Sequence, residues 1–229
     1  MNKVALITGI NGQDGSYLAE FLLDKGYDVW GTIKRNSVSE NQTSRLDGVY
    51  NIIKNNLRYA DLTDLSSLLT VIKECNPDEV YNLGAQSHVR ISFDQPIYTA
   101  QATGIGVLNM LEAVRIHNPQ IRIYQASSSE MFGNSIDEDG FQRETTPLIP
   151  VSPYGCSKVF GYNIARNYRN SYGMYISNGI LFNHESPRRG SNFVTNKVAK
   201  TAVEIKLGMR DKLALGNLNA TRDWGHAKD

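Results

Sequence analysis

Cysteine is scarce in this chain, and its scarcity excludes two kinds of site. Cys75 and Cys156 are the two cysteines among 229 residues, too few for a disulfide framework or for the clusters that hold structural zinc. We therefore expect no metal site. Two isolated thiols fit a reducing compartment, and the chain enters an apolar segment at Lys3 with no signal peptide before it. These features predict a cytoplasmic protein.

An excess of charge of one sign is also lacking, as is any long hydrophobic run. The formal net charge is +1, from 24 Lys and Arg against 23 Asp and Glu, so nothing indicates a nucleic-acid or membrane partner. No stretch approaches the roughly 18 consecutive apolar residues of a membrane-spanning helix. A hydrophobic content of 41% and a length of 229 residues suit one domain with a smaller second region.

Short apolar runs alternate with segments of helical periodicity over most of the chain. We expect strands at residues 4–8, 28–33, 57–60, 79–83, 121–126 and 175–181, with helices between them. One long helix is expected over 98–116, and another from about Pro153 to Asn170. The alternation predicts an α/β domain with a doubly wound parallel sheet of the Rossmann type over residues 1–181. Residues 182–229 would begin a second region.

A glycine-rich turn follows the first predicted strand and precedes the first predicted helix. It reads Gly9-Ile10-Asn11-Gly12-Gln13-Asp14-Gly15, with the glycines three residues apart. In a strand–turn–helix unit, such glycines let the backbone approach a pyrophosphate, and the helix N-terminus attracts its charge. The turn therefore predicts a dinucleotide site, although a glycine-rich sequence alone is also a common structural turn.

The residues after the later strands indicate which dinucleotide is bound. An acidic residue after the second strand would hold the ribose of NAD, but the sequence there is Lys34-Arg35-Asn36-Ser37. Two cations and a hydroxyl suit the 2′-phosphate of NADP, the alternative being a solvated loop. Asp61 is placed to receive the adenine amino group. Gly84 to Ser87 should lie against the cofactor, because ligands bind at the carboxyl ends of parallel strands.

The stretch from Gln125 to Lys158 carries a hydroxyl, a carboxylate, a phenol and an amine. Ser128 and Glu130 fall just beyond the fifth predicted strand. A free Tyr has a pKa of about 10 and needs a shift of about 3 units to act as a base at neutral pH. A cation about 4–5 Å away supplies roughly 3–4 kcal/mol at an effective dielectric of about 20. Tyr154 and Lys158 share a helix face, so Lys158 is expected to activate Tyr154; a chance surface pair is the alternative.

These motifs resemble those of the extended short-chain dehydrogenases/reductases, and more closely those of the GDP-mannose 4,6-dehydratase family. The closer resemblance lies in residues 9–18, 84–89, 181–190, 216–218 and 222–229. It covers essentially the whole chain. Members of that family extend well beyond the position of Asp229, so the region from 182 onward is expected to be an incomplete nucleotide-sugar-binding region.

The resemblance implies a lyase, a hydro-lyase that keeps NADP bound throughout its reaction. In that family the sugar C4 hydroxyl is oxidised, water is eliminated across C5 and C6, and hydride returns to C6. Carried onto this chain, Tyr154 is the base for the oxidation, with Ser128 and Lys158 as its catalytic partners. Glu130 removes the C5 proton and protonates the leaving hydroxyl, a task that a simple dehydrogenase does not need. The family commonly has Thr where this chain has Ser128, which keeps the hydroxyl but lacks the stiffening methyl.

The resemblance also assigns ligands and partners. GDP-mannose or a related GDP-sugar is the implied substrate, and a homo-oligomer, either a dimer or a tetramer, is the implied assembly. The residues carried over to the cofactor are Gly9, Asn11, Gly12, Gln13, Asp14, Gly15, Arg35, Asn36, Ser37, Asp61, Leu62, Leu83, Gly84, Ala85, Gln86, Ser87, Tyr98, Tyr154, Lys158, His184 and Arg189. Those carried over to the substrate are Ser87, Asn183, Lys197 and Arg222, of which the two cations would face a diphosphate.

Other functions remain open at this point. A nucleotide-sugar reductase or epimerase would use the same Tyr154 and Lys158, and a dehydratase of another GDP-sugar, such as a GDP-heptose, would use the same chemistry. A non-catalytic NADP-binding protein would need only the dinucleotide site. The sequence disfavours a serine hydrolase, because Ser127 to Ser129 lack a glycine-flanked turn and a paired base.

Overall fold

The chain divides at Leu181 into two units, Met1–Leu181 and Phe182–Asp229. The structure is a computed structural model, and it describes residues 2–37, 42–219 and 221–229. The sequence places the boundary at the same residue, while the ligand that each unit binds stays a prediction. Each unit is described by itself below.

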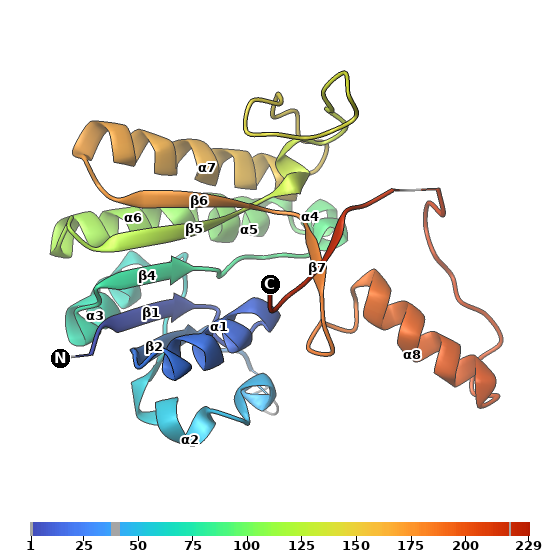
Figure 1. Cartoon of the computed structure of the whole chain (residues 1–229), viewed down its shortest axis with the longest axis horizontal. Helices are drawn as coiled ribbons and strands as arrows, with labels where there is room; N and C mark the ends of the chain where they lie inside the picture. Colours follow the sequence, from blue (N-terminus) through green and yellow to red (C-terminus); the bar gives the residue numbers. More distant parts are fainter. Residues whose placement is uncertain (1, 38–41, 220) are drawn as a thin grey trace. The chain divides into compact units, whose positions relative to one another are not determined.

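Six parallel strands form the sheet of the first unit in the order β3-β2-β1-β4-β5-β6 (Figure 1). The strands are β1 (Val4–Thr8), β2 (Asp28–Ile33), β3 (Leu57–Tyr59), β4 (Glu79–Asn82), β5 (Arg122–Ser128) and β6 (Ile176–Leu181). Their order reverses between β1 and β4, where the loops after the two strands diverge to opposite sides. This is the point at which doubly wound sheets bind ligands. The predicted fold class is confirmed.

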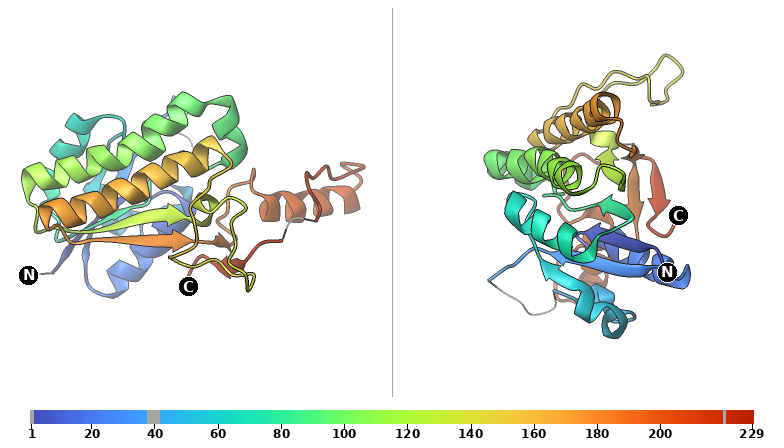
Figure 2. Two further views of the ribbon diagram at one scale, coloured as in Figure 1. Left: turned by 90° about the horizontal axis from the view of Figure 1, so that it is seen from above. Right: turned by 90° about the vertical axis from the view of Figure 1, so that its left-hand side faces the viewer.

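Helices cover both faces of this sheet (Figure 2). The α-helices are α1 (Gln13–Asp24), α2 (Tyr50–Ile53), α3 (Leu65–Cys75), α4 (Val89–Asp94), α5 (Pro96–Thr99), α6 (Gly106–His117) and α7 (Pro153–Tyr172). Short 3₁₀ turns lie at η1 (Ser44–Leu46), η2 (Lys54–Asn56) and η4 (Ser129–Met131). In both views of Figure 2, α6 and α7 lie side by side on one face, and α1 lies on the other.

Alternate residues of β1 supply the two cores. Ala5 and Ile7 are fully buried in a cluster with Leu22 of α1, whereas Leu6 is fully buried in a second cluster with Val114 of α6. Side chains alternate between the faces of a strand, so one short strand anchors both helical layers. Each fully buried Leu, Ile or Val contributes roughly 1.5–3 kcal/mol.

One predicted strand differs from the structure by more than one residue at an end, and one predicted helix differs in its continuity. The helix expected over 98–116 is broken by a π-helical segment, η3 (Ala100–Ile105), between α5 and α6. Gly104 and Gly106 lower the helix propensity there, and the Thr103 hydroxyl bonds the loop after β4. The fifth strand runs two residues further than expected, because Ser128 pairs with Leu181 in the β5–β6 ladder.

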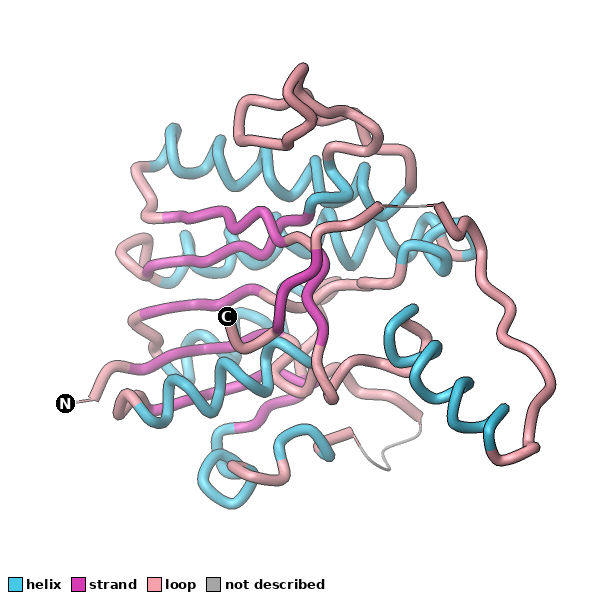
Figure 3. Tube along the Cα trace, turned by 45° about the vertical axis from the view of Figure 1, so that its right-hand side comes forward, coloured by secondary structure: helices cyan, strands magenta, loops and turns pink. Residues whose placement is uncertain are grey.

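The second unit contains β7 (Asn183–Glu185), α8 (Val194–Lys206) and β8 (Trp224–His226). The two strands pair in parallel, with Asn183 opposite Trp224, and they run side by side in Figure 3. In the described part of the chain, no helix combines the length and the apolar character needed to cross a membrane.

Candidate active site

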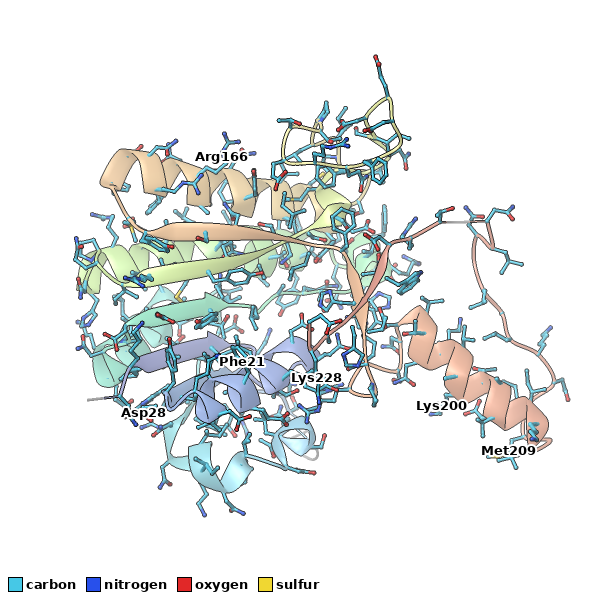
Figure 4. All side chains as sticks on the ribbon, viewed as in Figure 1. Phe21, Asp28, Arg166, Lys200, Met209 and Lys228 are labelled. Atoms are coloured by element: carbon cyan, nitrogen blue, oxygen red, sulfur yellow. The ribbon has the colours of Figure 1, made fainter. Side chains whose placement is uncertain are left out.

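Helix α7 begins where the sequence supplies a cap and a proline. The Ser152 hydroxyl accepts a hydrogen bond from the Gly155 amide at 3.0 Å, and Pro153 occupies the first turn, which does not need its missing amide hydrogen. Tyr154 and Lys158 then fall one turn apart on the buried face, with 8% and 6% of their surface exposed. Arg166 extends outward from the opposite side of α7 (Figure 4). The capped start therefore sets which side chains face the sheet.

The Lys158 ammonium is buried beside Tyr154. Its Nζ lies 5.7 Å from the centroid of the Tyr154 ring and donates to the Ala126 carbonyl oxygen at 2.9 Å. Burial lowers the pKa of Lys158 from 10.5 to about 8, and the negative charge of Asp14 partly opposes the shift. At neutral pH the group is an ammonium, which stabilises negative charge on a nearby phenolate.

Replacing Lys158 with Met is expected to stabilise the folded protein at pH 7. The pKa of Lys158 is about 8 in the folded state and 10.5 in the ordinary reference state. The unfolded state therefore binds more protons between these values, and wild-type stability rises with pH across that window. Below pH 8 the wild type carries the full penalty of burying a cation. The Met variant avoids it and should gain about 1–3 kcal/mol, net of the donor lost at Ala126.

Urea unfolding at pH 7 and pH 10 measures this effect. The stability difference between the Lys158→Met variant and the wild type should narrow as pH rises. Lys200→Met, on the exposed surface of α8, is the matched control and should leave stability nearly unchanged. A difference that stays constant or widens with pH would contradict the burial of a cation at Lys158.

Ser128 and the turn after it lie against the start of α7. The Ser128 hydroxyl accepts a hydrogen bond from the Glu130 amide at 3.2 Å and caps η4. A Cβ atom added to Gly155 would stand 2.7 Å from the Glu130 carbonyl oxygen, so glycine is required for this approach. The structure thus brings the Glu130 turn next to Tyr154, at the carboxyl end of β5.

The glycine turn after β1 is closed by its own backbone. The Gly12 amide donates to the Gly9 carbonyl oxygen at 2.9 Å. A Cβ on Gly15 would lie 2.4 Å from that same oxygen, so the turn can pack against α1 only with glycine there. Gly12 is the N-cap and has no side chain to occupy the first amides of α1. A compact backbone cradle at a helix N-terminus fits a pyrophosphate.

The loop after β4 is held by two side chains. The Gln86 amide donates to Thr103 Oγ1 at 3.0 Å, and that hydroxyl donates to the Gln86 carbonyl oxygen at 3.2 Å. The Gln86 side chain bonds the backbone of His88 in both directions, while His88 Nδ1 accepts the Ile91 amide at 3.4 Å and caps α4. Thr103 was missed from the sequence, where its only signal is a hydroxyl within an otherwise helical apolar stretch.

Lys34 joins two residues that the sequence assigns to the cofactor. Its Nζ lies 3.2 Å from Asp61 Oδ2 and 4.4 Å from the Tyr98 ring centroid, with a hydrogen bond to the Tyr98 hydroxyl. Burial alone would raise the pKa of Asp61, but hydrogen bonds from Thr63 and the contact with Lys34 outweigh it and lower the pKa. Asp61 is therefore an anion with a cation at its side.

The Arg35 side chain contacts a different residue from the Lys34 side chain. Its Cζ lies 5.6 Å from the Tyr59 ring centroid, and Arg35, Asn36 and Ser37 are all exposed. The two cations that the sequence grouped for one phosphate are thus separated, with Lys34 committed to Asp61. The contact of Arg35 with a 2′-phosphate stays a prediction.

The predicted residues of β7 and the loop after it lie in the second unit. Asn183 and His184 belong to β7, and His184 Nδ1 is 2.7 Å from the Phe182 carbonyl oxygen. The Arg189 guanidinium is 3.1 Å from a Glu185 oxygen. Arg189 is therefore already ion-paired, and its contact with a cofactor stays a prediction.

The two cations predicted for a diphosphate also lie in this unit. Lys197 on α8 donates to the Ala214 carbonyl oxygen at 2.6 Å, and the exposed Arg222 donates to the Thr221 carbonyl oxygen at 2.8 Å. Neither bond neutralises the positive charge, so both side chains keep the charge that a diphosphate requires. Their role in binding stays a prediction.

The side chains that the first unit brings together are of the types that acid–base catalysis uses. The arrangement supplies a phenol with a buried ammonium, a strand-end hydroxyl and a carboxylate-bearing turn. Among the residues that the structure describes, no group of three His, Cys, Asp or Glu side chains gathers to hold a metal ion.

Comparisons with known proteins identify one family. The sequence model of a family described as GDP-mannose 4,6 dehydratase matches residues 6–229. The GDP-mannose 4,6-dehydratase of Yersinia enterocolitica is 57% identical over 234 residues, which cover 99% of this chain and 62% of that protein. The GDP-mannose 4,6 dehydratase of Homo sapiens is 51% identical over 235 residues, with coverages of 99% and 62%. This chain therefore spans about three fifths of the length of these curated relatives.

A solved structure shares the fold. The crystal structure of dTDP-glucose 4,6-dehydratase from Bacillus anthracis, in complex with NAD, superposes with a TM-score of 0.79 at 26% sequence identity. The match covers 98% of this chain and 68% of that one.

Proposed function

Because the chain belongs to the GDP-mannose 4,6-dehydratase family, we propose that it converts GDP-mannose into GDP-4-dehydro-6-deoxy-mannose and water. The observation that carries the proposal is the close approach of the Glu130 turn to the capped start of α7, which carries Tyr154 and Lys158. A base for oxidation and a second acid–base group at one strand end are the two functions that this reaction needs. The whole reaction stays a proposal, since the relatives are longer than this chain.

The proposed cofactor is NADP. The cradle at Gly9 to Gly15 fits a dinucleotide, and the solved enzyme from Bacillus anthracis contains NAD, which supports a nicotinamide dinucleotide. Arg35 and Ser37, in place of an acidic residue after β2, support a 2′-phosphate. When bound, NADP would accept a hydride from the sugar and later return it.

Four side chains take part in the proposed reaction. Tyr154 removes the proton of the C4 hydroxyl, and the Lys158 ammonium stabilises the phenolate that does so. Ser128 donates a hydrogen bond to the C4 oxygen. The resulting C4 ketone acidifies the C5 proton, which Glu130 removes. Glu130 then protonates the C6 hydroxyl, which leaves as water.

Mass spectrometry of GDP-mannose incubated with the purified protein tests this proposal. Without added reductant, the nucleotide sugar should lose the mass of one water while the NADP pool stays oxidised. A parallel incubation with GDP-heptose tests the effect of Ser128 in place of Thr. Dehydration of the heptose alone would overturn the substrate but keep the mechanism, and no dehydration of either sugar would overturn the function.

Arg35→Ala is expected to weaken NADP binding about 10- to 100-fold and to leave NAD binding nearly unchanged. Hydrogen bonds to a charged group contribute about 1.5–3 kcal/mol, and NAD lacks the phosphate that would receive them. Titration calorimetry with both dinucleotides measures the change. Arg90→Ala, an exposed arginine paired with Asp94, is the control. Equal weakening of NAD and NADP binding would show that Arg35 does not contact the 2′-phosphate.

A further inference from the structure

A row of buried polar side chains crosses the sheet of the first unit. Thr8 of β1, Asn82 of β4 and Gln125 of β5 are each no more than 2% exposed. Thr8 Oγ1 donates to Asn82 Oδ1 at 2.7 Å, and Asn82 Nδ2 donates to Gln125 Oε1 at 2.7 Å. Buried polar groups lower stability unless they are paired, and these three are paired with one another across adjacent strands.

Both ends of the row reach residues of the candidate site. At one end, the amide of Gly84, in the loop after β4, donates to Thr8 Oγ1 at 2.9 Å. At the other end, Gln125 Nε2 donates to the Ala126 carbonyl oxygen at 2.9 Å. The same oxygen accepts the hydrogen bond from Lys158 Nζ, also at 2.9 Å. The row is thus a continuous path from the predicted cofactor loop to the predicted catalytic lysine.

The direction of every bond in this path is determined. A backbone amide only donates and a backbone carbonyl only accepts, so Gly84 and Ala126 fix the two ends. Because the Ala126 oxygen takes the Gln125 amide nitrogen, the Gln125 side-chain oxygen faces Asn82 and the Asn82 oxygen faces the Thr8 hydroxyl, which donates to it. Asn82 then donates to an oxygen of Gln125, and Gln125 donates onward to Ala126. Neither amide can turn around without placing two donors or two acceptors face to face.

We propose that Asn82 and Gln125 are positioning residues for Lys158. They fix the position of its ammonium relative to the loop after β4. This inference rests on the proposed function, since it presumes that Lys158 assists Tyr154. The Ala126 oxygen shares its acceptor capacity between Gln125 and Lys158. Gln125 therefore limits how strongly that oxygen binds the ammonium. The ammonium can then stay close enough to Tyr154 to stabilise its phenolate.

The charged and titratable groups around Lys158 are few in the described structure. Asp14 acts on it from α1, and Tyr154 faces it from its own helix, α7. The β5 side contributes only neutral groups, Ala126 and Gln125. A change at Gln125 alters the hydrogen bonding of Lys158 without changing the charge around it.

Gln125→Met is the main test, because it removes a donor and adds no charge. The Ala126 oxygen would then bind the ammonium more strongly, and Lys158 should titrate at a pH higher by about half a unit or more. The hydride-transfer step should nevertheless slow by about 10- to 100-fold, because the ammonium is drawn from Tyr154. A structural defect alone would not combine a raised titration midpoint with a slower step.

Nuclear magnetic resonance of protein labelled with ¹³C at lysine Cε measures the titration without requiring catalysis. The Lys158 signal is identified by its absence from the spectrum of the Lys158→Met variant. In the wild type its midpoint is expected at about 8. If dehydration fails in the wild type, the proposed function is wrong, but this titration still decides whether Gln125 acts on Lys158.

Asn82→Leu is the second variant, for the case in which the Gln125→Met variant does not fold. A leucine cannot donate to Gln125 and adds no charge, so the Gln125 amide is no longer fixed in its orientation and donates less to the Ala126 oxygen. The Lys158 midpoint should rise again. Ser127 lies on the same strand as Gln125, and Ser127→Ala removes a part-buried bond to Asn178 of β6. This variant is the control and should leave the midpoint unchanged. An unchanged midpoint in both variants, or an equal shift in the control, would overturn the proposal.

Discussion

Glu130→Gln is expected to stop water elimination while the oxidation of the sugar continues. The amide has the shape of the carboxylate but cannot accept the C5 proton, so this step should slow by about 10²- to 10⁴-fold. Oxidation at C4 depends on Tyr154 and Lys158, which the substitution does not touch. Reduced nicotinamide should therefore accumulate to the concentration of active sites. Stopped-flow absorbance records this accumulation, and mass spectrometry records the missing product.

The effect of Glu130→Gln distinguishes the proposed dehydratase from a nucleotide-sugar reductase or epimerase. A nucleotide-sugar reductase or epimerase uses the same Tyr154 and Lys158 but no second acid–base group, so its turnover would change little. Glu138→Gln, at an exposed carboxylate in the loop between η4 and α7, is the matched control and should behave as wild type. Elimination at the wild-type rate in the Glu130→Gln variant would remove Glu130 from the mechanism.

Tyr154→Phe is expected to block the reaction one step earlier. The phenyl ring preserves packing at a position that is 8% exposed, but it carries no hydroxyl to remove the C4 proton. The oxidation should slow by about 10²- to 10⁴-fold, and no reduced nicotinamide should accumulate. Binding of NADP should change by less than about threefold, because the proposed cradle at Gly9 to Gly15 is intact.

A tyrosine on the same helix provides the comparison for Tyr154→Phe. Tyr162 lies two turns further along α7, where Arg166 stacks on its ring at 5.6 Å. Tyr162→Phe keeps that contact and should keep activity. Dehydrated product formed at the wild-type rate by the Tyr154→Phe variant would show that another group is the base. The Glu130→Gln and Tyr154→Phe variants thus differ in the accumulation of reduced nicotinamide, which can be measured without identifying the final product.

Much of the framework could be predicted from the sequence, because the relevant signals are local. Val4 to Thr8 and Asp28 to Ile33 are short apolar runs with turn residues at their ends, and both strands have the expected bounds. Ser152 and Pro153 mark the start of α7 by a cap and a fixed backbone angle. The register of Tyr154 and Lys158 follows from that start.

The contacts between distant segments could not be predicted, because they depend on tertiary packing. Lys34 reads as a phosphate ligand beside Arg35, yet in the structure it lies next to Asp61, which is 27 positions later in the chain. Gly155 reads as an ordinary helix residue until η4 is seen to approach it. No local pattern joins these residues.

The buried row of Thr8, Asn82 and Gln125 could not be predicted from the sequence for a related reason. Asn82 and Gln125 each stand in or at the end of an apolar run, where a single polar residue reads as an interruption of the strand. Their meaning depends on strand order, because β4 lies between β1 and β5 only in the folded sheet. The register pairs Asn82 with Gln125, and this pairing creates the path to Lys158.

The most direct test of the proposed mechanism follows one hydrogen atom. GDP-mannose that carries deuterium at C4 should give a dehydrated product that retains the deuterium, now at C6, as mass spectrometry and magnetic resonance of the product would show. This result requires a hydride that leaves the sugar and returns to it within one active site. A dehydrated product that has lost the deuterium would contradict the mechanism.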